Sequence, residues 1–563
     1  MSAPVVAEQR APFSEQGETK KQHIPRSVLT GVSLLGFALP AAAYLWFIHQ
    51  YGSNVPIADQ WVNFNLIGHS YSGTLSLGDL WAQHVAERMF FPNLVVLLLG
   101  HTAHFNLFVE MYLSAILLFI ATGLLIVAHK RRSPSTSWIY YWPVAIMMWS
   151  FVQFDDTLWG FQVAWYLIVL ALVAVLFLLD KPTLNSLILS GAIAAAIVGS
   201  YSSIQGLLIW PAGLVLLYQR RRSQPLLLAW ILSAVAAGVG YVYRLQPPSH
   251  RLYVLHHPVT AAKLFFLAIG DIIAQPTPPG GDNAILLLGV LIFLIGTWVV
   301  IRYGLRRDET SGAPIGVALI CFGFLFALAV PVGTVWVSGA WVGTGSRYAI
   351  YLLLVLVGSY LALISRPVSK AMDGRRDAIA RILVRTAVVA VICLQVVLGA
   401  VNGLAGGRTT HQARSAAADV LVNIDHASNA EIWNAFAWDP PPGSITVMRS
   451  LHLTLFGTNA TALYAKEGLV LAPESLAFAS TGEHRAKAST GQAFAYVVQA
   501  AGSPFPTISS RDLPPWLLLT DQHNGMATLS AINPHRGIAR FTLTAENLAG
   551  RINQVFRLII KHR

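Results

Sequence analysis

Residues 107–132 read LFVEMYLSAILLFIATGLLIVAHKRR. The apolar part, 107–128, has the length of roughly 20 residues that a helix needs to cross a hydrocarbon core of about 30 Å. A basic cluster, Lys130 to Arg132, follows it directly. Positive residues of this kind collect at the cytoplasmic ends of membrane helices. This stretch therefore predicts a membrane helix and gives its direction.

The composition of the whole chain agrees with a membrane protein. Of 563 residues, 55% are hydrophobic and 11% are charged, whereas a soluble domain carries about 25% charged residues. This excludes an ordinary soluble enzyme and a disordered chain. The two cysteines, Cys321 and Cys393, both lie inside apolar runs, which excludes a disulfide framework and a cysteine metal site.

Apolar runs recur along the first 403 residues, and we expect about eleven spans of roughly 20 residues each. We expect a polytopic α-helical membrane protein with a C-terminal α+β or β-rich extracytoplasmic domain. The expected spans are 28–48, 107–128, 138–153, 158–180, 184–200, 205–218, 226–243, 284–301, 313–335, 348–365 and 382–402.

The basic residues fix the orientation of these spans. With the N-terminus in the cytoplasm, 20 Lys and Arg fall in cytoplasmic segments and 5 fall in the opposite loops of the spanning region. Such an imbalance is the positive-inside signal. Most of the net charge of +12 is therefore explained by topology, and nucleic acid is not expected as a partner. The localisation predicted is the bacterial inner membrane, with several passes.

The predicted domains follow from this topology. They are a cytoplasmic tail at 1–27, a membrane domain at 28–403 and a periplasmic domain at 404–563. Long outer loops are expected at 49–106 and 244–283, and within the first of these 84–106 is interpreted as a short surface or re-entrant helix. Runs at 493–499, 516–520 and 537–544 predict strands in the C-terminal domain, and the Pro- and Gly-rich segment 275–281 predicts an irregular loop.

Ionisable residues at membrane boundaries are costly and tend to be functional. Here they gather at the outer ends of the spans. On a helix, His84, Glu87 and Arg88 would share one face. The candidate site residues are Asp59, His84, Glu87, Arg88, Asp155, Asp156, Arg244, Arg251, Arg347 and Tyr348.

Each candidate also has a structural interpretation. Asp59 or the pair Asp155 and Asp156 would suit a helix N-terminus. Glu87 and Arg88 would suit a local ion pair, and Arg347 would suit an anchor at the membrane interface. The placement of all these charges at one side of the membrane favours a functional site.

A lipid-linked phosphate substrate would explain such a set of charges. Arginine offers phosphate a bidentate fork, one carboxylate would serve as a general base, and a second would bind a divalent cation such as Mg²⁺ or Mn²⁺ or orient an acceptor. Glycosyl transfer needs these parts, because the phosphate leaves as an anion and the acceptor hydroxyl loses a proton.

The pattern resembles the GT-C superfamily of integral-membrane glycosyltransferases. The resemblance rests on the many spans, the long first outer loop, Asp59 in Ala58-Asp59-Gln60, the second-loop acids Asp155 and Asp156, and Arg347 in Ser346-Arg347-Tyr348. It implies that Asp59 is the general base. It further implies that Asp155, Asp156, Glu87 and His84 bind acceptor or metal, and that Arg347, Tyr348, Arg88, Arg244 and Arg251 bind the donor phosphate.

The resemblance also implies the substrates. The donor would be a polyprenyl-phosphate sugar, and the acceptor an envelope glycan or glycolipid, with membrane lipids around the protein. The chain has Phe90-Phe91-Pro92 in place of a His-Pro-Pro run and lacks a Trp-Trp-Asp motif. We therefore expect a bacterial branch outside the protein O-mannosyl, aminoarabinose and oligosaccharyl transferases.

Two other functions stay open at this point. A transporter or flippase of a lipid-linked or envelope glycan would place paired charges near mid-span and would show inverted repeats. A glycan polymerase or ligase would carry a longer late outer loop with several arginines. The charges of this chain lie at span ends, no repeat is evident, and the loop 336–347 is short.

Overall fold

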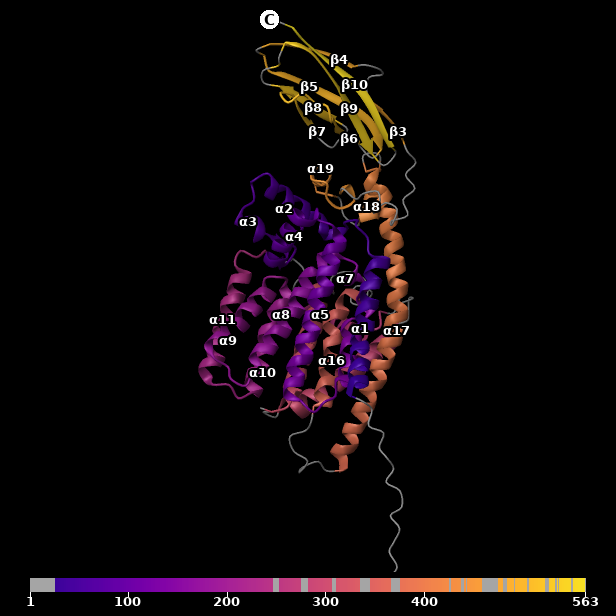
Figure 1. Ribbon diagram of the computed structural model, residues 1–563. Coiled ribbons are helices and arrows are strands. Elements are labelled where there is room, and N and C mark those ends of the chain that lie inside the picture. Colours follow the sequence, from indigo (N-terminus) through magenta and orange to yellow (C-terminus); the bar gives the residue numbers. More distant parts are fainter. Residues whose placement is uncertain are drawn as a thin grey trace, which may run out of the picture.

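The computed structural model describes the chain in segments, and it shows a helical domain with a smaller β domain at one end (Figure 1). The expected tail at 1–27 lies almost wholly outside the described residues, as does the loop 275–281. The described residues are 26–246, 253–274, 282–305, 310–334, 345–365, 375–424, 427–436, 440–441, 443–457, 474–478, 484–490, 492–503, 506–521, 526–531, 534, 536–547 and 550–561.

The helical domain is that of a polytopic membrane protein, but the expected count of eleven spans is not supported. Among the described residues, 7 helices are long and apolar enough to cross a membrane, and each coincides with an expected run. The run 138–153 is broken into η2, α6 and η3, with α6 only 7 residues long. The spanning segments are Leu107–Arg132, Gly160–Leu179, Gln224–Val242, Asn283–Gly304, Ala313–Thr334, Ser346–Ile364 and Ala378–Val422.

Besides the helices in the spanning segments, the helical domain contains helices that are shorter or only partly described. Helix α1 is 26 residues long, but part of it has no described side chains. The bounds of the helices are α1 Arg26–Tyr51, α5 Leu107–Arg132, α6 Trp142–Met148, α8 Val163–Leu179, α9 Ser186–Ser200, α10 Ile209–Gln219, α11 Gln224–Val242, α12 Tyr253–His256, α13 Pro258–Gly270, α14 Asp282–Val299, α15 Ala313–Thr334 and α16 Ala349–Ile364.

Small residues allow two largely buried helices, α15 and α16, to approach closely. A Cβ added to Gly316 would lie 2.3 Å from the carbonyl oxygen of Gly358. Close backbone contact through small residues is how membrane helices associate, since apolar side chains gain little from leaving lipid for protein. Both helices contribute buried side chains to the hydrophobic core of the helical domain.

One buried acid links the C-terminal ends of α5, α8 and α10, which the sequence analysis expects to face the cytoplasm. Asp180 accepts ion-pair contacts from Arg220 at 2.5 Å, Arg132 at 3.0 Å and Arg131 at 3.2 Å. Its side chain has no exposed surface. Three of the basic residues used to predict orientation therefore also have a structural role, because they compensate a buried negative charge.

The first outer loop folds into short elements over the outer ends of the helices. They are η1 Ala58–Trp61, α2 Val62–Tyr71, α3 Leu77–Leu80, strands β1 Gln83–His84 and β2 Glu87–Arg88, and α4 Phe90–Ala103. With 14 residues, α4 is about 21 Å long, too short to cross about 30 Å of hydrocarbon.

The expectation that His84, Glu87 and Arg88 lie on a helix is wrong. They form a two-stranded antiparallel hairpin in which His84 pairs with Glu87 and Gln83 pairs with Arg88. Val85 in the turn has a φ of +53°. This is a left-handed backbone conformation, and a right-handed α-helix cannot continue through it. Helix begins only at Phe90.

The expected domain boundary at 403/404 is also displaced. Helix α17, Arg375–Val422, is 48 residues long in total and passes through this boundary along the side of the bundle (Figure 1). After it, α18 Asn429–Phe436 and α19 Ser444–Ser450 lie between the helical and β domains. Phe436 and Met448 are buried in the core of the helical domain, so the helical domain extends beyond residue 403.

The β domain contains two four-stranded sheets with their own apolar core. The sheet orders are β4-β10-β9-β6 and β3-β5-β8-β7, antiparallel except for the parallel pair β10 and β4. The three expected strands are confirmed as β5, β7 and β9. The strands are β3 Glu474–Phe478, β4 His484–Ser489, β5 Phe494–Ser503, β6 Thr507–Ser509, β7 Leu518–Asp521, β8 Met526–Ala531, β9 Gly537–Asn547 and β10 Gly550–Lys561.

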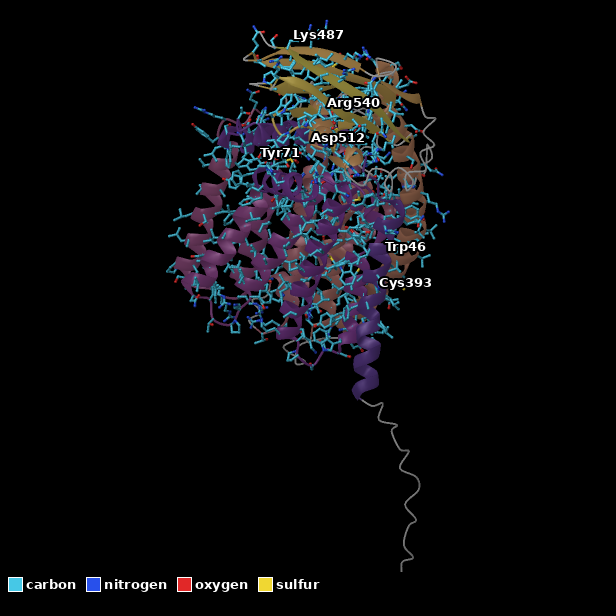
Figure 2. All side chains as sticks on the ribbon, turned by 45° about the horizontal axis from the view of Figure 1, so that its top comes forward. Trp46, Tyr71, Cys393, Lys487, Asp512 and Arg540 are labelled. Atoms are coloured by element: carbon cyan, nitrogen blue, oxygen red, sulfur yellow. The ribbon has the colours of Figure 1, made fainter. Side chains whose placement is uncertain are left out.

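The surface side chains labelled on the β domain are charged, whereas those labelled on the sides of the helical domain are uncharged. Figure 2 shows Lys487, Asp512 and Arg540 on the β domain, and Trp46 and Cys393 on the sides of the helical domain. Trp46 is 47% exposed on α1, and Cys393 is exposed on α17. Apolar side chains on the flank of the bundle suit contact with lipid.

Candidate functional site

The β1–β2 hairpin holds two titratable side chains next to Asp59. Partners across an antiparallel pair point to the same face of a sheet, so His84 and Glu87 share one face of the hairpin. His84 Nε2 lies 3.6 Å from Asp59 Oδ1, and Asp59 is about one-third exposed. Asp59 lies in η1, which follows an extended residue at Ile57. The first outer loop therefore brings three of the sequence-predicted residues together; we call Asp59, His84 and Glu87 the loop cluster.

Glu87 is held from the side opposite to Asp59. The amide Nε2 of Gln205 donates a hydrogen bond to Glu87 Oε1 at 3.4 Å, and Ser203 also bonds the carboxyl. Burial raises the pKa of Glu87 above its usual range, against the opposing effects of Ser203, His84 and Gln205. Glu87 can therefore hold a proton at a pH where an exposed glutamate has lost it.

Arg88 points to the other face of the hairpin, where both terminal nitrogens of its guanidinium donate to backbone carbonyls and its Nε has no hydrogen-bond partner among the described residues. Its guanidinium donates to the carbonyl of Trp81 at 2.6 Å and to that of Tyr243 at 2.8 Å. The side chain is 4% exposed. The structure thus gives Arg88 a structural role, fixing the hairpin to the end of α11, and the expected phosphate contact finds no support in its geometry.

A second cluster forms where α7, Phe154–Thr157, meets η8, Ser346–Tyr348. The backbone N–H of Asp155 donates to Ser346 Oγ at 3.1 Å. Arg347 interacts electrostatically with both Asp155 and Asp156. Its guanidinium carbon lies 5.0 Å from the centre of the Tyr348 ring, and Nη2 donates to the Tyr348 hydroxyl at 3.1 Å. We call Asp155, Asp156 and Arg347 the carboxylate–arginine cluster.

The two carboxyls of this cluster differ in burial. Asp156 is 1% exposed, and neither of its oxygens has a hydrogen-bond partner among the described residues. Burial, and then the charge of Asp155, raise the pKa of Asp156 well above its usual range. Burial also raises the pKa of Asp155, while Ser346, Arg347 and Arg414 oppose that rise. Burial therefore disfavours the ionised form of both carboxyls in spite of Arg347, and a bound cation would favour that form.

A tyrosine hydrogen-bond network borders Asp156. The hydroxyl of Tyr44 lies 2.8 Å from Thr157 Oγ1 and 3.0 Å from the hydroxyl of Tyr166. The charge of Asp156 reaches both tyrosines. These side chains come from α1, α7 and α8, so three elements fix the position of the Asp156 backbone.

The two clusters are neighbours. The charges of Glu87 and Asp156 both act on the hydroxyl of Tyr351, near the start of α16. Glu87 belongs to the loop cluster and Asp156 to the carboxylate–arginine cluster. Residues separated by some 70 positions in sequence therefore lie within electrostatic range of one side chain, at the same end of the helical bundle.

Sequence reasoning missed Arg414, which belongs to the carboxylate–arginine cluster. Its charge acts on Asp155, and Nη1 donates to the carbonyl of Val55 at 3.3 Å. The signal was present in the sequence: no proline occurs between 403 and 422, so a helix can continue into the segment that was assigned to a separate domain.

Sequence reasoning also missed a polar pair beneath Asp59. Gln60 Nε2 donates to Glu110 Oε2 at 2.9 Å, and both side chains are fully buried. Gly160 lies against this carboxyl, since an added Cβ would be 2.2 Å from Glu110 Oε2. The acid lies in the first turn of α5, where a carboxylate suits the positive end of the helix dipole.

The structure describes one of the other two arginine candidates, and it lies apart from both clusters. Arg244 is exposed and lies over the ring of Tyr243 at 5.3 Å, and Arg251 lies outside the described residues. A cavity of about 460 Å³ occurs elsewhere, lined by Tyr140, Tyr360 and Arg385 among others. It contains none of the predicted site residues.

The carboxylate–arginine cluster was also expected to hold a divalent cation. No group of three or more His, Cys, Asp or Glu suited to a metal occurs in the described part of the chain. Mg²⁺ is commonly bound by one or two carboxylates with the remaining ligands from water and substrate phosphate. Asp155 with the unpartnered oxygens of Asp156 fits that form of site.

Comparison with known proteins adds little. No protein-family model and no curated protein matches the chain. Among solved structures, it is similar to a chimeric titin Z1Z2 functionalized with a KLER exogenous peptide from decorin, with 17% identity over 16% of this chain and 100% of that one, at a TM-score of 0.15. So low a score carries no argument. The fold defines a polytopic membrane protein with a β-rich C-terminal domain, and its function is argued from the clusters.

Proposed function

We propose that the protein is a GT-C-type membrane glycosyltransferase that moves a sugar from a polyprenyl-phosphate donor to a cell-envelope acceptor. One observation supports the proposal: Glu87 of the loop cluster and Asp156 of the carboxylate–arginine cluster both act electrostatically on the hydroxyl of Tyr351. One cluster offers a base and the other offers cations, which is the division of labour that glycosyl transfer from a phosphate requires.

Asp59 acts as the general base in this proposal. It takes the proton of an acceptor hydroxyl, whose oxygen forms a bond to the anomeric carbon of the sugar. The bond from that carbon to the phosphate oxygen breaks, and the electron pair leaves with the polyprenyl phosphate. His84, 3.6 Å from Asp59, orients the carboxylate, and Glu87 binds the acceptor.

Arg347 binds the departing phosphate, and Arg414 adds a second positive charge beside Asp155. An arginine fork matches phosphate oxygens and strengthens as negative charge develops on them. Asp155 and Asp156 would hold Mg²⁺ or Mn²⁺, which when bound neutralises phosphate charge. Tyr348, bonded to Arg347, keeps the guanidinium in place.

This function places the clusters at the outer face of a bacterial inner membrane. The basic inner ends of the helices would face the cytoplasm and the β domain the periplasm, as the distribution of Lys and Arg favours. The donor lipid would enter from the bilayer, and the acceptor glycan or glycolipid would arrive from the outer side.

The proposal is tested with purified protein in liposomes. Polyprenyl-phosphate-linked glucose, mannose and arabinose, each radiolabelled in the sugar, are supplied with extracted envelope glycolipids, and labelled glycolipid and free sugar are both measured. We expect transfer from one donor and a loss of about 10²-fold or more in Asp59→Asn, the usual contribution of a general base.

The matched control is Asp512→Asn, the same change at an exposed aspartate of the β domain (Figure 2), which should keep full activity. Unchanged transfer in a folded Asp59→Asn protein would remove Asp59 from the mechanism. Movement of the intact donor lipid across the membrane with neither labelled product would support the transporter class instead.

A further inference from the structure

A cavity of about 260 Å³ with both polar and apolar lining residues lies in the first outer loop beside the loop cluster. It is lined by α2, α3, the hairpin and α4, with Phe161 contributed from the 3-10 helix η4, Gly160–Gln162. His84 belongs to its lining and, on its other side, lies 3.6 Å from Asp59. A molecule in this cavity would therefore meet the loop cluster directly.

The groups that line the cavity suit hydroxyl groups. Asn63, Asn65 and Asn93 all belong to the lining, and amides can both donate and accept hydrogen bonds. Asn63 is 3% exposed, and its Nδ2 has no hydrogen-bond partner in the described part of the chain. A buried donor without a partner costs free energy, so a ligand that accepts from Asn63 would remove that cost.

An aromatic side forms part of the same cavity. Phe161 lies in the lining, stacked on Trp159 at 5.4 Å and in edge contact with His84 at 5.5 Å. Such a ring offers a flat apolar surface. A sugar ring has one face of C–H groups and a rim of hydroxyls, which is the combination that Phe161 and the asparagines complement.

The charge of the cavity argues against an anionic ligand. Among the described residues, no lysine or arginine lines it, and its one carboxylate is Asp79. His69, with Nδ1 3.5 Å from Asp79 Oδ1, and His84 also belong to the lining. The hydroxyl of Ser76 donates to Asp79 Oδ2 at 2.7 Å, and its backbone N–H donates at 2.8 Å. These bonds hold the pKa of Asp79 below its usual range. A fixed negative charge without a neighbouring Lys or Arg would repel phosphate.

We infer that this cavity binds one neutral sugar residue of the acceptor, with Asn63 donating to a ring substituent and Phe161 packing on the ring. The volume is slightly below the range of roughly 300–1,000 Å³ that drug-sized ligands occupy, which suits a single ring. The inference rests on the proposed function and names its acceptor as an uncharged saccharide, separate from the phosphate-binding side at Arg347.

Saturation-transfer NMR on the full-length protein in nanodiscs tests the inference without any turnover. The probes are the methyl glycosides of glucose, galactose, mannose and arabinose, with glucose 1-phosphate as the anionic counterpart. We expect a signal from at least one glycoside and none from glucose 1-phosphate. In Asn63→Leu, binding should weaken about tenfold, the effect of one hydrogen bond of roughly 1.4 kcal/mol.

Asn423→Leu is the matched control, because Asn423 is exposed in the turn directly after α17 and the chemical change is the same. A photoreactive diazirine analogue of the bound glycoside gives a readout on the unmodified protein. The expected adducts fall on peptides that contain residues 62–69 or 83–93. Glycoside signals that Asn63→Leu leaves unchanged, adducts only elsewhere, preference for glucose 1-phosphate, or no binding at all would each overturn the inference.

The two proposals fail in different ways. Glycoside binding at this cavity without any sugar transfer in liposomes would retain the saccharide site and remove the transferase function. Sugar transfer that proceeds normally in Asn63→Leu, with an unchanged KM for acceptor, would retain the transferase and remove this site.

Discussion

The backbone N–H of Asp155 donates a hydrogen bond to the hydroxyl of Ser346 at 3.1 Å, across 191 positions of sequence. This contact joins a single helical turn, α7, to the residue before Arg347. The carboxylates and the arginine of one cluster are thus held by adjoining backbone segments. Because these residues interact electrostatically, the pKa of each carboxyl depends on the charges of the others.

Replacing Arg347 with glutamine should weaken donor binding and shift the pH dependence of activity. The Arg347 charge lowers the pKa of Asp155 and of Asp156, so its removal raises both. If the carboxylates act in ionised form, the acidic limb of the pH–rate profile moves to higher pH. The KM for donor should rise about tenfold or more, since a charge-assisted bond contributes roughly 1.5–3 kcal/mol.

Arg540→Gln, on the β domain (Figure 2), is the control for the loss of one positive charge, and it should change neither quantity. A profile of kcat/KM against pH for the three proteins measures both effects. An Arg347→Gln profile that keeps its acidic limb in place would show that Arg347 does not influence these carboxyls.

Asp156→Asn should stabilise the fold while impairing activity. Burial raises the pKa of Asp156 well above its usual range, so the folded state holds that proton more tightly than the unfolded chain does. Stability from this group is present below the unfolded pKa and is lost as pH rises through the folded pKa. The neutral amide avoids this loss.

Thermal unfolding in detergent at about pH 4, close to the usual pKa of an aspartate, and at about pH 8, well above it, measures the difference. The Tm of Asp156→Asn should exceed that of the parent protein at the higher pH, and the gain should shrink at the lower one. Equal Tm differences at both values would contradict an ionisation penalty at Asp156.

Gly160→Ala should destabilise the protein and reduce activity. The new methyl group would lie 2.2 Å from Glu110 Oε2, and Glu110 is buried against Gln60. Overpacking of this kind costs about 1–3 kcal/mol, and displacement of Gln60 would move its neighbour Asp59. The measurements are Tm and sugar transfer.

Gly123→Ala is the matched control, because nothing lies within 4 Å of a Cβ at that position and alanine favours helix over glycine. A second substitution that shortens the acid, Glu110→Asp, should restore part of the stability of Gly160→Ala. Full stability and activity of the single Gly160→Ala variant would refute the close contact.

Asp180→Asn should unfold the inner end of the bundle more readily. Removing one partner of a buried charge group costs about 3–5 kcal/mol. Of the three arginines, Arg220 has the least exposed side chain at 1% and Arg131 the most at 26%. Arg220→Gln should therefore cost more stability than Arg131→Gln, with unfolding in detergent as the readout. The reverse order would mean that burial does not set the strength of these ion pairs.

Much of the membrane domain could be predicted from the sequence because lipid imposes a simple requirement. A continuous apolar run must form a helix that satisfies its own backbone, and the run at 107–128 became α5. The run at 138–153 is apolar, as this requirement demands, but it does not form one continuous helix of sufficient length. Its helix ends at Met148, and Trp149 leaves the helical conformation.

The candidate site was predicted in part. Asp59, Asp155 and Arg347 were proposed as site residues because charged residues are scarce in this chain and these lie at the outer ends of expected spans. The pairing of His84 with Glu87 could not be predicted, since it depends on a left-handed residue at Val85, a conformation that β-branched side chains seldom adopt. Arg414 was missed because a change in composition was taken for the end of a helix that in fact continues.

The uninterrupted course of α17 imposes a strict requirement on its length. Arg385, which donates to the carbonyl of Leu363, and Arg414, which donates to the carbonyl of Val55, belong to this one helix. Their separation of 29 positions corresponds to about 44 Å, and each inserted residue would rotate Arg414 by about 100° around the helix axis. Substitution of the lipid-facing side chains of α17 would leave both contacts in place. Insertion or deletion of a single residue between these two arginines would instead detach one of them from its partner.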